Sequence, residues 1–475
     1  MPPPATPSVK GVWLGTLGRG AGALRLQARL DPDDAAQSCA LDSIDQDSFD
    51  IPCRVVPRNG AEITIEVAAV KGGWKGTLSS DGNTLTGTWS QGGPSRPLVL
   101  TRQTKAFEPA KVELQPAMPP VDIEGLRAVL DADLASALEK GDLAPATSAG
   151  VTVGVVHHGV RRVFTYGASK PDAVFEIGSI TKTFTGLILA QLVQQKKVRL
   201  DEPVRALLPA GTVEKPATGD EITLLDLSDQ HSGLPRMPDN FKPANPENPY
   251  VDYDAKALFA FLGSHGVGRP KEAPFGYSNV GVGLLGAALV QKMGISYEAL
   301  LEQQVTGPLG MRETAIALAP ALRGRLAAGH DRKHAIVREW DFDALAGAGA
   351  IRSTAGDMLT YLEAQLHPEA VASKGKATAP AKTLAAAIKE SHVRRASADD
   401  DMEIALGWLH VVASGSYWHN GATAGHTAFA AFDPARDFAV IVLCNSSGGF
   451  ADKLGSHVAQ RLAGRPAISL APPDR

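Results

Sequence analysis

The spacing of apolar residues changes sharply near residue 103, and this change predicts two different architectures in series. Before it, about eight short apolar runs alternate with turn residues, and no helical period lies between them. Runs of this length and spacing predict a small all-β barrel or sandwich. After it, helical patterns dominate, and strand patterns occur only at the two ends of the segment. A length of 475 residues also exceeds what one hydrophobic core usually supports.

We therefore expect a small all-β domain over residues 1–102, a proline-rich linker over 103–121 and a second domain over 122–475. In the first domain, three tryptophans flanked by glycines are expected to fill the core, namely Trp13, Trp74 and Trp89. The second domain opens with an amphipathic helix pattern over 123–139 and two strand patterns. It closes with three strand patterns and a final helix near 451–462, which predicts an α+β fold whose antiparallel sheet is built from both ends of the segment.

The charge and cysteine content narrow the function classes. A net charge of −4 without long basic runs gives no footprint for nucleic acid, and no run of 18 apolar residues predicts a transmembrane helix. There is no CxxC pair and no HExxH motif, so a metal site is not expected. Cys39 and Cys53 can form a disulfide if their strands are neighbours, with free thiols as the alternative. Cys444 lies in an apolar run and is expected to be buried.

The first candidate for chemistry is the tetrapeptide Ser179-Ile180-Thr181-Lys182 at the start of a predicted helix. A serine and a lysine three residues apart lie on the same side of a helix. A partly desolvated lysine has a lowered pKa and can take the serine proton. The alternative is an ordinary helix-capping serine. A second Ser-x-x-Lys, which begins at Ser373, has no preceding strand and is interpreted as chance.

Two further elements follow in order along the chain. Tyr277-Ser278-Asn279 precedes a glycine-rich apolar helix pattern, and beside a lysine ammonium the Tyr277 phenolate becomes more accessible for proton transfer. His419-Asn420-Gly421 lies at the end of a predicted strand. A strand edge there can run alongside a substrate, and its backbone N–H can complete an oxyanion hole. The alternative for Tyr277 is a half-buried structural tyrosine, with Asn279 as a helix cap. His426, a few residues after His419, is interpreted as part of the loop structure and not as a second catalyst.

Taken in order, S-I-T-K, Y-S-N and H-N-G resemble the three motifs of serine β-lactamases and penicillin-binding enzymes. Three further stretches are similar to landmarks of this family, namely ITLLDLSDQHSGLPR (222–236), GPLGMRETAIA (307–317) and GAGAIRSTAGDMLTYL (347–362). The resemblance covers roughly residues 122–465. The front domain is similar to the lipocalin-like barrels attached to some bacterial hydrolases, on its GxWxG-type and GTWSQGG motifs.

The resemblance implies a two-lobed fold, an antiparallel sheet flanked by helices plus an all-α lobe, with the site between the lobes. It implies that Ser179 is the acylated nucleophile and that Lys182 and Tyr277 handle its proton. Asn279 would bind substrate, and His419 would orient and charge the tyrosine. The site is completed by Gly421 on the strand beside the substrate and by an oxyanion hole made of the backbone N–H groups of Ser179 and Ala422. No metal or organic cofactor is implied.

His419 stands where most β-lactamases have a lysine that helps hold the lactam carboxylate. This departure moves the likeness toward D,D-peptidases, D-aminopeptidases and esterases. The expected function is hydrolysis of a small ester or peptide substrate through an acyl-enzyme on Ser179. A peptide acyl transferase would show the same motifs, and a catalytically silent penicillin-binding-like receptor is the alternative from a different class.

The sequence leaves two alternatives for the cellular compartment in which the protein works. MPPPATPSVK lacks the charged and apolar regions of a signal peptide, so the protein stays in the cytoplasm or begins after a removed signal. The resemblance and the two front cysteines favour a periplasmic or secreted protein. The oligomeric state is not predicted.

Overall fold

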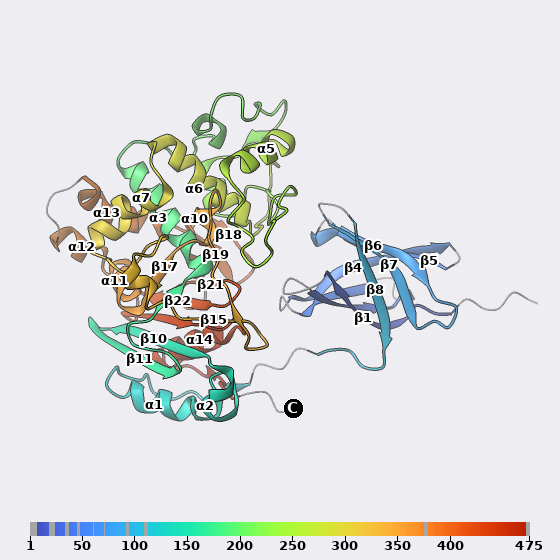
Figure 1. Ribbon diagram of the computed structural model, residues 1–475, viewed down its shortest axis with the longest axis horizontal. Helices are drawn as coiled ribbons and strands as arrows, with labels where there is room; N and C mark the ends of the chain where they lie inside the picture. Colours follow the sequence, from blue (N-terminus) through green and yellow to red (C-terminus); the bar gives the residue numbers. More distant parts are fainter. Residues whose placement is uncertain are drawn as a thin grey trace, which may run out of the picture. The chain divides into compact units, whose positions relative to one another are not determined.

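The computed structural model describes residues 7–18, 24–33, 38–44, 48–59, 61–70, 72–91, 95–108, 113–374 and 379–471. The chain divides into two compact units, Met1–Lys111 and Val112–Arg475. Figure 1 shows the strands of the first unit in blue and the mixed second unit in green to red. Gly92 and Gly93 of the GTWSQGG motif lie outside the described residues.

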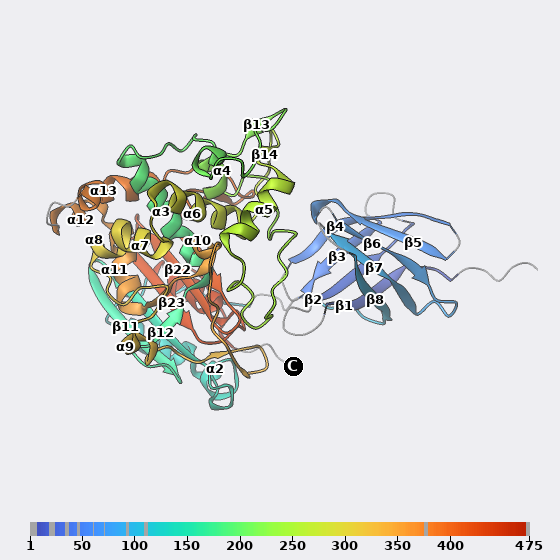
Figure 2. The ribbon, with the colours of Figure 1, turned by 45° about the horizontal axis from the view of Figure 1, so that its top comes forward.

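The first unit is a closed antiparallel barrel in which each strand pairs with the next and β8 returns to β1 (Figure 2). Its strands are β1 (Gly11–Leu17), β2 (Leu24–Leu30), β3 (Cys39–Ser43), β4 (Ser48–Asn59), β5 (Glu62–Val67), β6 (Gly72–Leu78), β7 (Thr84–Gln91) and β8 (Arg96–Gln103). The three predicted core tryptophans are buried, with 0%, 1% and 5% of their surface exposed for Trp13, Trp74 and Trp89. The Trp13 and Trp74 indole N–H groups donate to the carbonyls of Val9 and Leu98, so their polar atoms are paired inside the core.

Cys39 and Cys53 are direct register partners on β3 and β4, and they form a disulfide. Cys444 is free and buried, as its apolar surroundings predicted. The segment predicted as a linker contains a two-residue strand, β9 (Leu114–Gln115), which pairs with β24 (Ala467–Ile468) near the end of the chain.

The disulfide is expected to stabilise the barrel by restricting its unfolded state. A bridge with a sequence separation of 14 closes a short loop, for which the chain-entropy cost corresponds to about 3 kcal/mol. The double substitution Cys39→Ser with Cys53→Ser should therefore lower the urea midpoint of the barrel transition, followed by tryptophan fluorescence. Cys444→Ala is the matched control and should leave that transition in place. An unchanged midpoint in the double variant would show that the bridge adds no stability.

The second unit is built around an eight-stranded antiparallel sheet in the order β11-β10-β23-β22-β21-β20-β19-β18. Its strands are β10 (Gly150–His157), β11 (Val160–Gly167), β18 (Ala396–Ser397), β19 (Met402–Ile404), β20 (Leu409–Val411), β21 (Tyr417–Ala422), β22 (Thr427–Asp433) and β23 (Phe438–Cys444). Because β10 pairs with β23, strands from both ends of the unit lie side by side in one sheet, as predicted. Short two-stranded pairs lie outside it: β12 (Val174–Glu176) with β17 (Arg352–Thr354), β13 (Asp220–Glu221) with β14 (Gly268–Arg269), and β15 (Gly329–His330) with β16 (Ile336–Val337).

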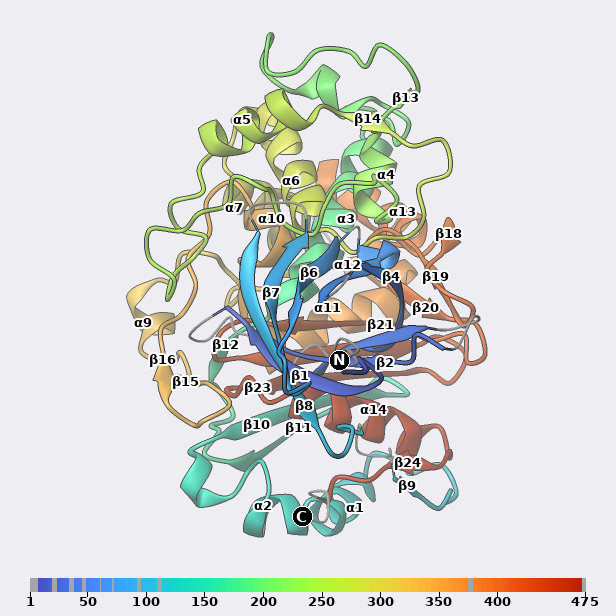
Figure 3. The same cartoon turned by 90° about the vertical axis from the view of Figure 1, so that its right-hand side faces the viewer.

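Helices cover both faces of this sheet (Figure 3). One face packs on α1 (Leu126–Asp133), α2 (Ala135–Lys140) and α14 (Phe450–Leu462). The helix predicted over 123–139 is therefore two helices, which meet at Leu134. The other face carries the larger core, in which α11 (Ala355–Leu366) packs against β10, β22 and β23 and α3 (Thr181–Gln194) packs among the other helices.

The remaining helices form the mostly helical lobe beyond α3 and α11. They are α4 (Leu224–Ser228), α5 (Ala255–His265), α6 (Asn279–Met293), α7 (Tyr297–Leu301), α8 (Gly307–Leu309), α9 (Pro320–Arg323), α10 (Ala346–Gly349), α12 (Pro368–Lys374) and α13 (Ala379–Ser391). Within the described ranges, no single helix is long and apolar enough to cross a membrane. One pair bent by 85°, Asn279–Met293 with Tyr297–Leu309, meets the test by length and composition only.

Candidate active site

Ser179 lies in a short 3-10 helix, Gly178–Ile180, that leads directly into α3. Lys182 is one turn later, and its Nζ lies 2.9 Å from the Ser179 Oγ, as the three-residue spacing predicted. The same Nζ donates to the carbonyl oxygen of Ala348 at 2.7 Å. Ser179 is partly exposed, whereas only 1% of Lys182 is exposed. The pair therefore presents a reachable hydroxyl backed by a buried amine.

Burial lowers the pKa of Lys182 well below its usual value, and the nearby charge of Arg236 lowers it further. Among the described residues, no carboxylate pairs with the amine, and its two polar partners are a hydroxyl and a carbonyl oxygen. A neutral amine has a lone pair, which can accept the proton of Ser179. The environment thus favours Lys182 as a proton acceptor over Lys182 as a fixed cation.

Tyr277 and Asn279 lie on either side of Ser278, the residue that caps the N-terminus of α6. Ser278 is the N-cap, and its Oγ accepts the N–H of Gly281 and donates to the carbonyl of Pro235. The cap is therefore Ser278 and not Asn279. Asn279 is the first helical residue, and its side-chain amide faces the sulfur of Met237 at 3.7 Å. Because Tyr277 directly precedes this capping residue, the cap fixes the position of the Tyr277 backbone at the start of α6.

Two basic side chains lie against the Tyr277 ring, with Lys182 Nζ 4.9 Å and Arg236 Cζ 5.0 Å from its centroid. Burial raises the pKa of Tyr277, although a hydrogen bond with Ser179 and the charge of Arg236 both act to lower it. The expectation of a more accessible phenolate is therefore wrong in direction, because desolvation outweighs the neighbouring charges. Tyr277 is a protonated phenol at neutral pH and can donate a proton.

His419 lies on β21 with its ring 6.3 Å from the Tyr277 ring. Burial and the charge of Lys182 lower the pKa of His419 to about 4. Its Nδ1–H donates to the carbonyl oxygen of Asn420 at 2.5 Å, which leaves Nε2 as an acceptor. The imidazole is neutral at pH 7. It can contact and orient Tyr277, but it does not supply the charge that the resemblance implied.

Alternate residues of β21 face opposite sides of the sheet. Trp418 stacks on Phe429 and Asn420 donates to Asp452 of α14, so these two face α14. Gly421 faces the other way, where its backbone touches the turn that carries Ser179. A Cβ at Gly421 would lie 1.9 Å from the Ile177 carbonyl oxygen and 2.9 Å from the Ser179 nitrogen. Only glycine permits this approach.

The close packing of β21 against the turn of Ser179 also brings Ala422 near the nucleophile. Gly178 has a φ of +50°, and a Cβ there would lie 2.6 Å from the Ala422 nitrogen. The backbone nitrogens of Ala422 and Ser179 thus belong to two segments in direct contact, and Ala422 is exposed. This juxtaposition is the one that an oxyanion hole of two N–H groups requires.

A buried carboxylate that the sequence analysis missed joins these two segments. Glu176 is three residues before Ser179, and 4% of it is exposed. Its Oε2 accepts from Thr423 Oγ1 at 2.7 Å and lies 3.2 Å from His426 Nδ1, and its Oε1 accepts from the Trp340 N–H at 2.8 Å. The Arg352 guanidinium is 3.6 Å from Oε1. Glu176 therefore ties the strand before Ser179 to the residues after Ala422.

Replacing Glu176 by glutamine is expected to lower the free energy of unfolding at pH 7 by about 3–5 kcal/mol, because it leaves buried partners of a charge pair unmatched. Burial alone would raise the pKa of Glu176, but hydrogen bonds from His426 and Thr423 and the charge of Arg352 lower it below the ordinary glutamate value of 4.5. The contribution of the carboxylate is therefore present above pH 4.5 and is lost as the pH falls through the lowered pKa.

The measurement is urea unfolding of both proteins at pH 7 and at about pH 3.5. The difference between wild type and Glu176→Gln should shrink at the lower pH. Glu66→Gln is the control, since Glu66 forms an exposed ion pair with Arg54 and should change stability by less than about 1 kcal/mol. A difference that stays constant with pH would show that Glu176 does not act through its charge.

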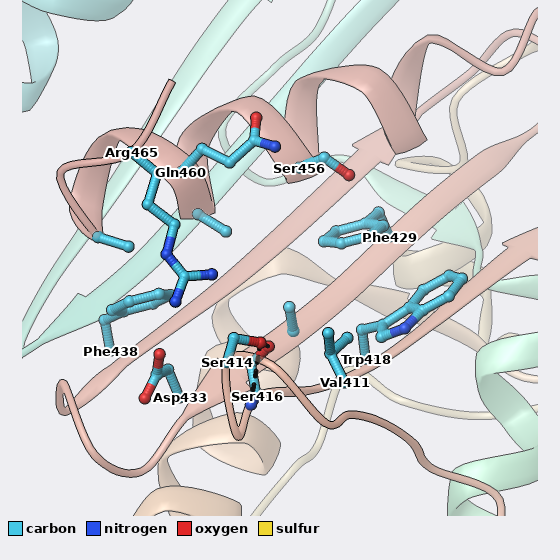
Figure 4. A pocket seen from close by; sticks show the side chains of 13 residues that line it. Val411, Ser414, Ser416, Trp418, Phe429, Asp433, Phe438, Ser456, Gln460 and Arg465 are labelled. Atoms are coloured by element: carbon cyan, nitrogen blue, oxygen red, sulfur yellow. Dashed lines mark hydrogen bonds between the residues drawn. The ribbon is translucent and has the colours of Figure 1, made fainter. Parts of the chain in front are cut away.

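A separate cavity lies away from these residues, between β21–β23 and α14 (Figure 4). Its volume is about 220 Å³, and Trp418, Phe429 and Phe438 form its aromatic walls. It opens on the face of the sheet that packs against α14 and is lined by none of the candidate residues. Within the part of the chain that the structure describes, no group of three His, Cys, Asp or Glu side chains could hold a metal ion.

Comparisons with known proteins agree with this geometry. The family described as Beta-lactamase matches residues 135–464. A beta-lactamase of Pseudomonas fluorescens is 26% identical over 366 residues, which cover 68% of this chain and 94% of that relative. The D-alanyl-D-alanine-carboxypeptidase/endopeptidase AmpH of Escherichia coli K12 is 30% identical over 221 residues, 45% of this chain and 56% of the relative. The match thus spans about half the length of AmpH.

Solved structures share the fold of the second unit. A class C beta-lactamase mutant superposes with a TM-score of 0.59 at 20% identity, over 73% of this chain and 99% of that chain. A class C beta-lactamase from Rhodobacter sphaeroides gives a TM-score of 0.57 at 25% identity, over 71% of this chain and 98% of the other. The α+β fold predicted from the strand order is therefore confirmed.

Proposed function

Because the chain belongs to the beta-lactamase family of serine hydrolases, we propose that it forms an acyl-enzyme on Ser179 and hydrolyses a carboxylic ester or an amide, including peptide bonds next to a D-residue. The observation that carries this proposal is the 2.9 Å contact between the partly exposed Ser179 hydroxyl and the buried Lys182 amine. An amine whose pKa is lowered by burial is the base that a serine nucleophile needs.

In the proposed acylation step, Lys182 accepts the hydroxyl proton and Ser179 Oγ bonds to the carbonyl carbon of the substrate. The negative oxygen of the tetrahedral intermediate binds the N–H groups of Ser179 and Ala422. Its collapse breaks the bond to the leaving group, and Tyr277 donates the proton that the leaving group takes up. Lys182 returns its proton to Tyr277, which restores both groups. His419 keeps the phenol in place, and Asn279 contacts the substrate.

In deacylation, a water molecule replaces the leaving group. Its proton passes to the Tyr277–Lys182 pair, its oxygen bonds to the acyl carbon, and Ser179 regains a proton as its bond to that carbon breaks. A peptide acceptor in place of water would make the same site an acyl transferase, so the two reactions differ only in the second nucleophile.

The test compares a short p-nitrophenyl ester with a D-alanine p-nitroanilide, each with wild type and with Ser179→Ala. Serine-dependent turnover of the ester alone supports an esterase, and serine-dependent cleavage of the anilide supports a D-peptidase. Release of a transfer product when an amine is added supports the acyl transferase. Rates that do not depend on Ser179, or the absence of any rate, would contradict the proposal and favour a silent receptor.

We also propose that the protein works in an oxidising compartment such as the periplasm or the extracellular space. The disulfide between Cys39 and Cys53 supports this, because structural disulfides persist mainly outside the reducing cytoplasm. Protein from its native cells, lysed directly into a denaturant that contains an excess of a thiol reagent, should show one titratable thiol, that of Cys444. Three titratable thiols would contradict the proposal.

A further inference from the structure

Arg236 is a cationic residue beside the Tyr277 ring of the candidate site. Its side chain is exposed, and its guanidinium carbon lies 5.0 Å from the centroid of the Tyr277 ring. Among the residues that the structure describes, none forms an ion pair or a side-chain hydrogen bond with this guanidinium. The acidic residues shortly before it are engaged elsewhere, since Asp226 pairs with Arg269 and Asp229 lies against His231.

The backbone of Arg236 is held firmly against the start of α6. Its carbonyl oxygen accepts the N–H groups of Asn279 at 3.0 Å and of Val280 at 3.3 Å. The preceding carbonyl, that of Pro235, accepts the Ser278 hydroxyl at 2.7 Å. The root of the side chain is thus fixed to the same helix end that positions Tyr277. A guanidinium on such an anchor is placed for binding with little loss of conformational freedom.

Neither of the other basic groups at the site supplies a lasting positive charge. Lys182 is buried with its amine shared between Ser179 and a carbonyl, and the pKa of His419 is lowered to about 4. Arginine stays charged at every working pH and binds carboxylates through two parallel hydrogen bonds. The site therefore has one exposed, permanent cation, and it lies on the side of Tyr277.

We propose that Arg236 binds a carboxylate carried by the leaving group of the substrate. The inference rests on the proposed function, in which Tyr277 protonates the leaving group and that group therefore lies next to the Tyr277 ring. A free carboxylate one or two bonds beyond the departing oxygen or nitrogen then falls within reach of the guanidinium. The substrate class is an acyl derivative of a hydroxy acid or amino acid with its terminal carboxylate free.

The test uses two esters with the same scissile bond, N-acetylglycyl-D-lactic acid and its neutral amide, N-acetylglycyl-D-lactamide. Wild type should hydrolyse the acid with a kcat/KM about 10- to 100-fold above that of the amide, as expected for a charge-assisted hydrogen bond. Arg236→Gln should remove this preference by raising KM for the acid alone, while any change in kcat, which would come from the lost charge beside Lys182 and Tyr277, should be the same for the acid and the amide. Arg236→Lys should keep part of the preference, and the preference of the wild type should fall with added salt.

Arg199→Gln is the matched control, because Arg199 is an exposed arginine that pairs with Asp201 beyond the end of α3. It should keep the wild-type preference. Equal loss of kcat on both esters in Arg236→Gln, with KM for the acid unchanged, would mean that Arg236 only tunes Tyr277, and this would overturn the inference. Serine-dependent hydrolysis of p-nitrophenyl butyrate without any preference for the acid would overturn it too. If no ester is hydrolysed in a Ser179-dependent way, the proposed function fails and the inference fails with it.

Discussion

Replacing Ser179 by alanine is expected to lower kcat on the preferred ester or amide by at least about 10⁴-fold, with the fold unchanged. The substitution removes the Oγ atom that Lys182 deprotonates and that carries the acyl group. What remains is an oxyanion hole and a bound substrate, which together supply only a small part of the rate. Loss of one hydroxyl at a partly exposed position should not change the circular dichroism spectrum or the urea midpoint by a measurable amount.

The control for this variant is Ser373→Ala, which alters the other Ser-x-x-Lys of the chain, at the end of α12. It should keep the full rate. Steady-state kinetics with purified variants, checked for contaminating esterase by active-site titration, give the comparison. A Ser179→Ala protein that retained more than a tenth of the wild-type kcat would show that the nucleophile lies elsewhere.

Replacing Gly421 by alanine is expected to be nearly as damaging, although it adds only one methyl group. The new Cβ would lie 1.9 Å from the Ile177 carbonyl oxygen, so β21 or the turn of Ser179 must move. A shift of either segment separates the two backbone N–H groups proposed to bind the oxyanion. Loss of one such donor lowers kcat by about 10²- to 10³-fold, and the strained packing lowers the free energy of unfolding by about 1–3 kcal/mol.

The comparison variant is Gly356→Ala in the first turn of α11, where a Cβ would meet its nearest atom at 3.9 Å. This change should leave kcat unchanged and should not destabilise the protein, since alanine favours a helix over glycine. Kinetics and urea unfolding of both variants separate the two effects. If Gly421→Ala kept wild-type kcat, contact between β21 and the Ser179 turn would not be needed for the reaction.

Local spacing explains which parts of the site were predictable. Ser179 and Lys182 are one helical turn apart, so their contact follows from helix geometry alone. The strands of the barrel and of the sheet ends were predictable for the same reason, because alternation and turn residues are local signals. The contact of Tyr277 with His419 joins residues far apart in the chain, and only the resemblance to a known family brought them together.

The residues that were missed are those whose partners lie far away. Glu176 sits in the strand pattern VFEIG, where a single acidic residue gives no sign that it is buried. Its partners Thr423 and His426 are about 250 positions later, and His426 was interpreted as loop structure. Arg236 is the last residue of ITLLDLSDQHSGLPR, and no residue near it in the sequence indicates whether it has a counterion. The rise in the pKa of Tyr277 likewise depends on burial, which the motif does not reveal.

The most direct test for Ser179 as the nucleophile is to trap the acyl-enzyme. Wild type and Ser179→Ala would be mixed with a slowly deacylated p-nitrophenyl ester, quenched with acid and analysed by intact mass and peptide sequencing. In wild type, the peptide that contains Ser179 should gain a mass equal to that of the acyl group, and in the variant it should gain none. An adduct on another residue, or steady p-nitrophenol release with no adduct at any time, would contradict this role of Ser179.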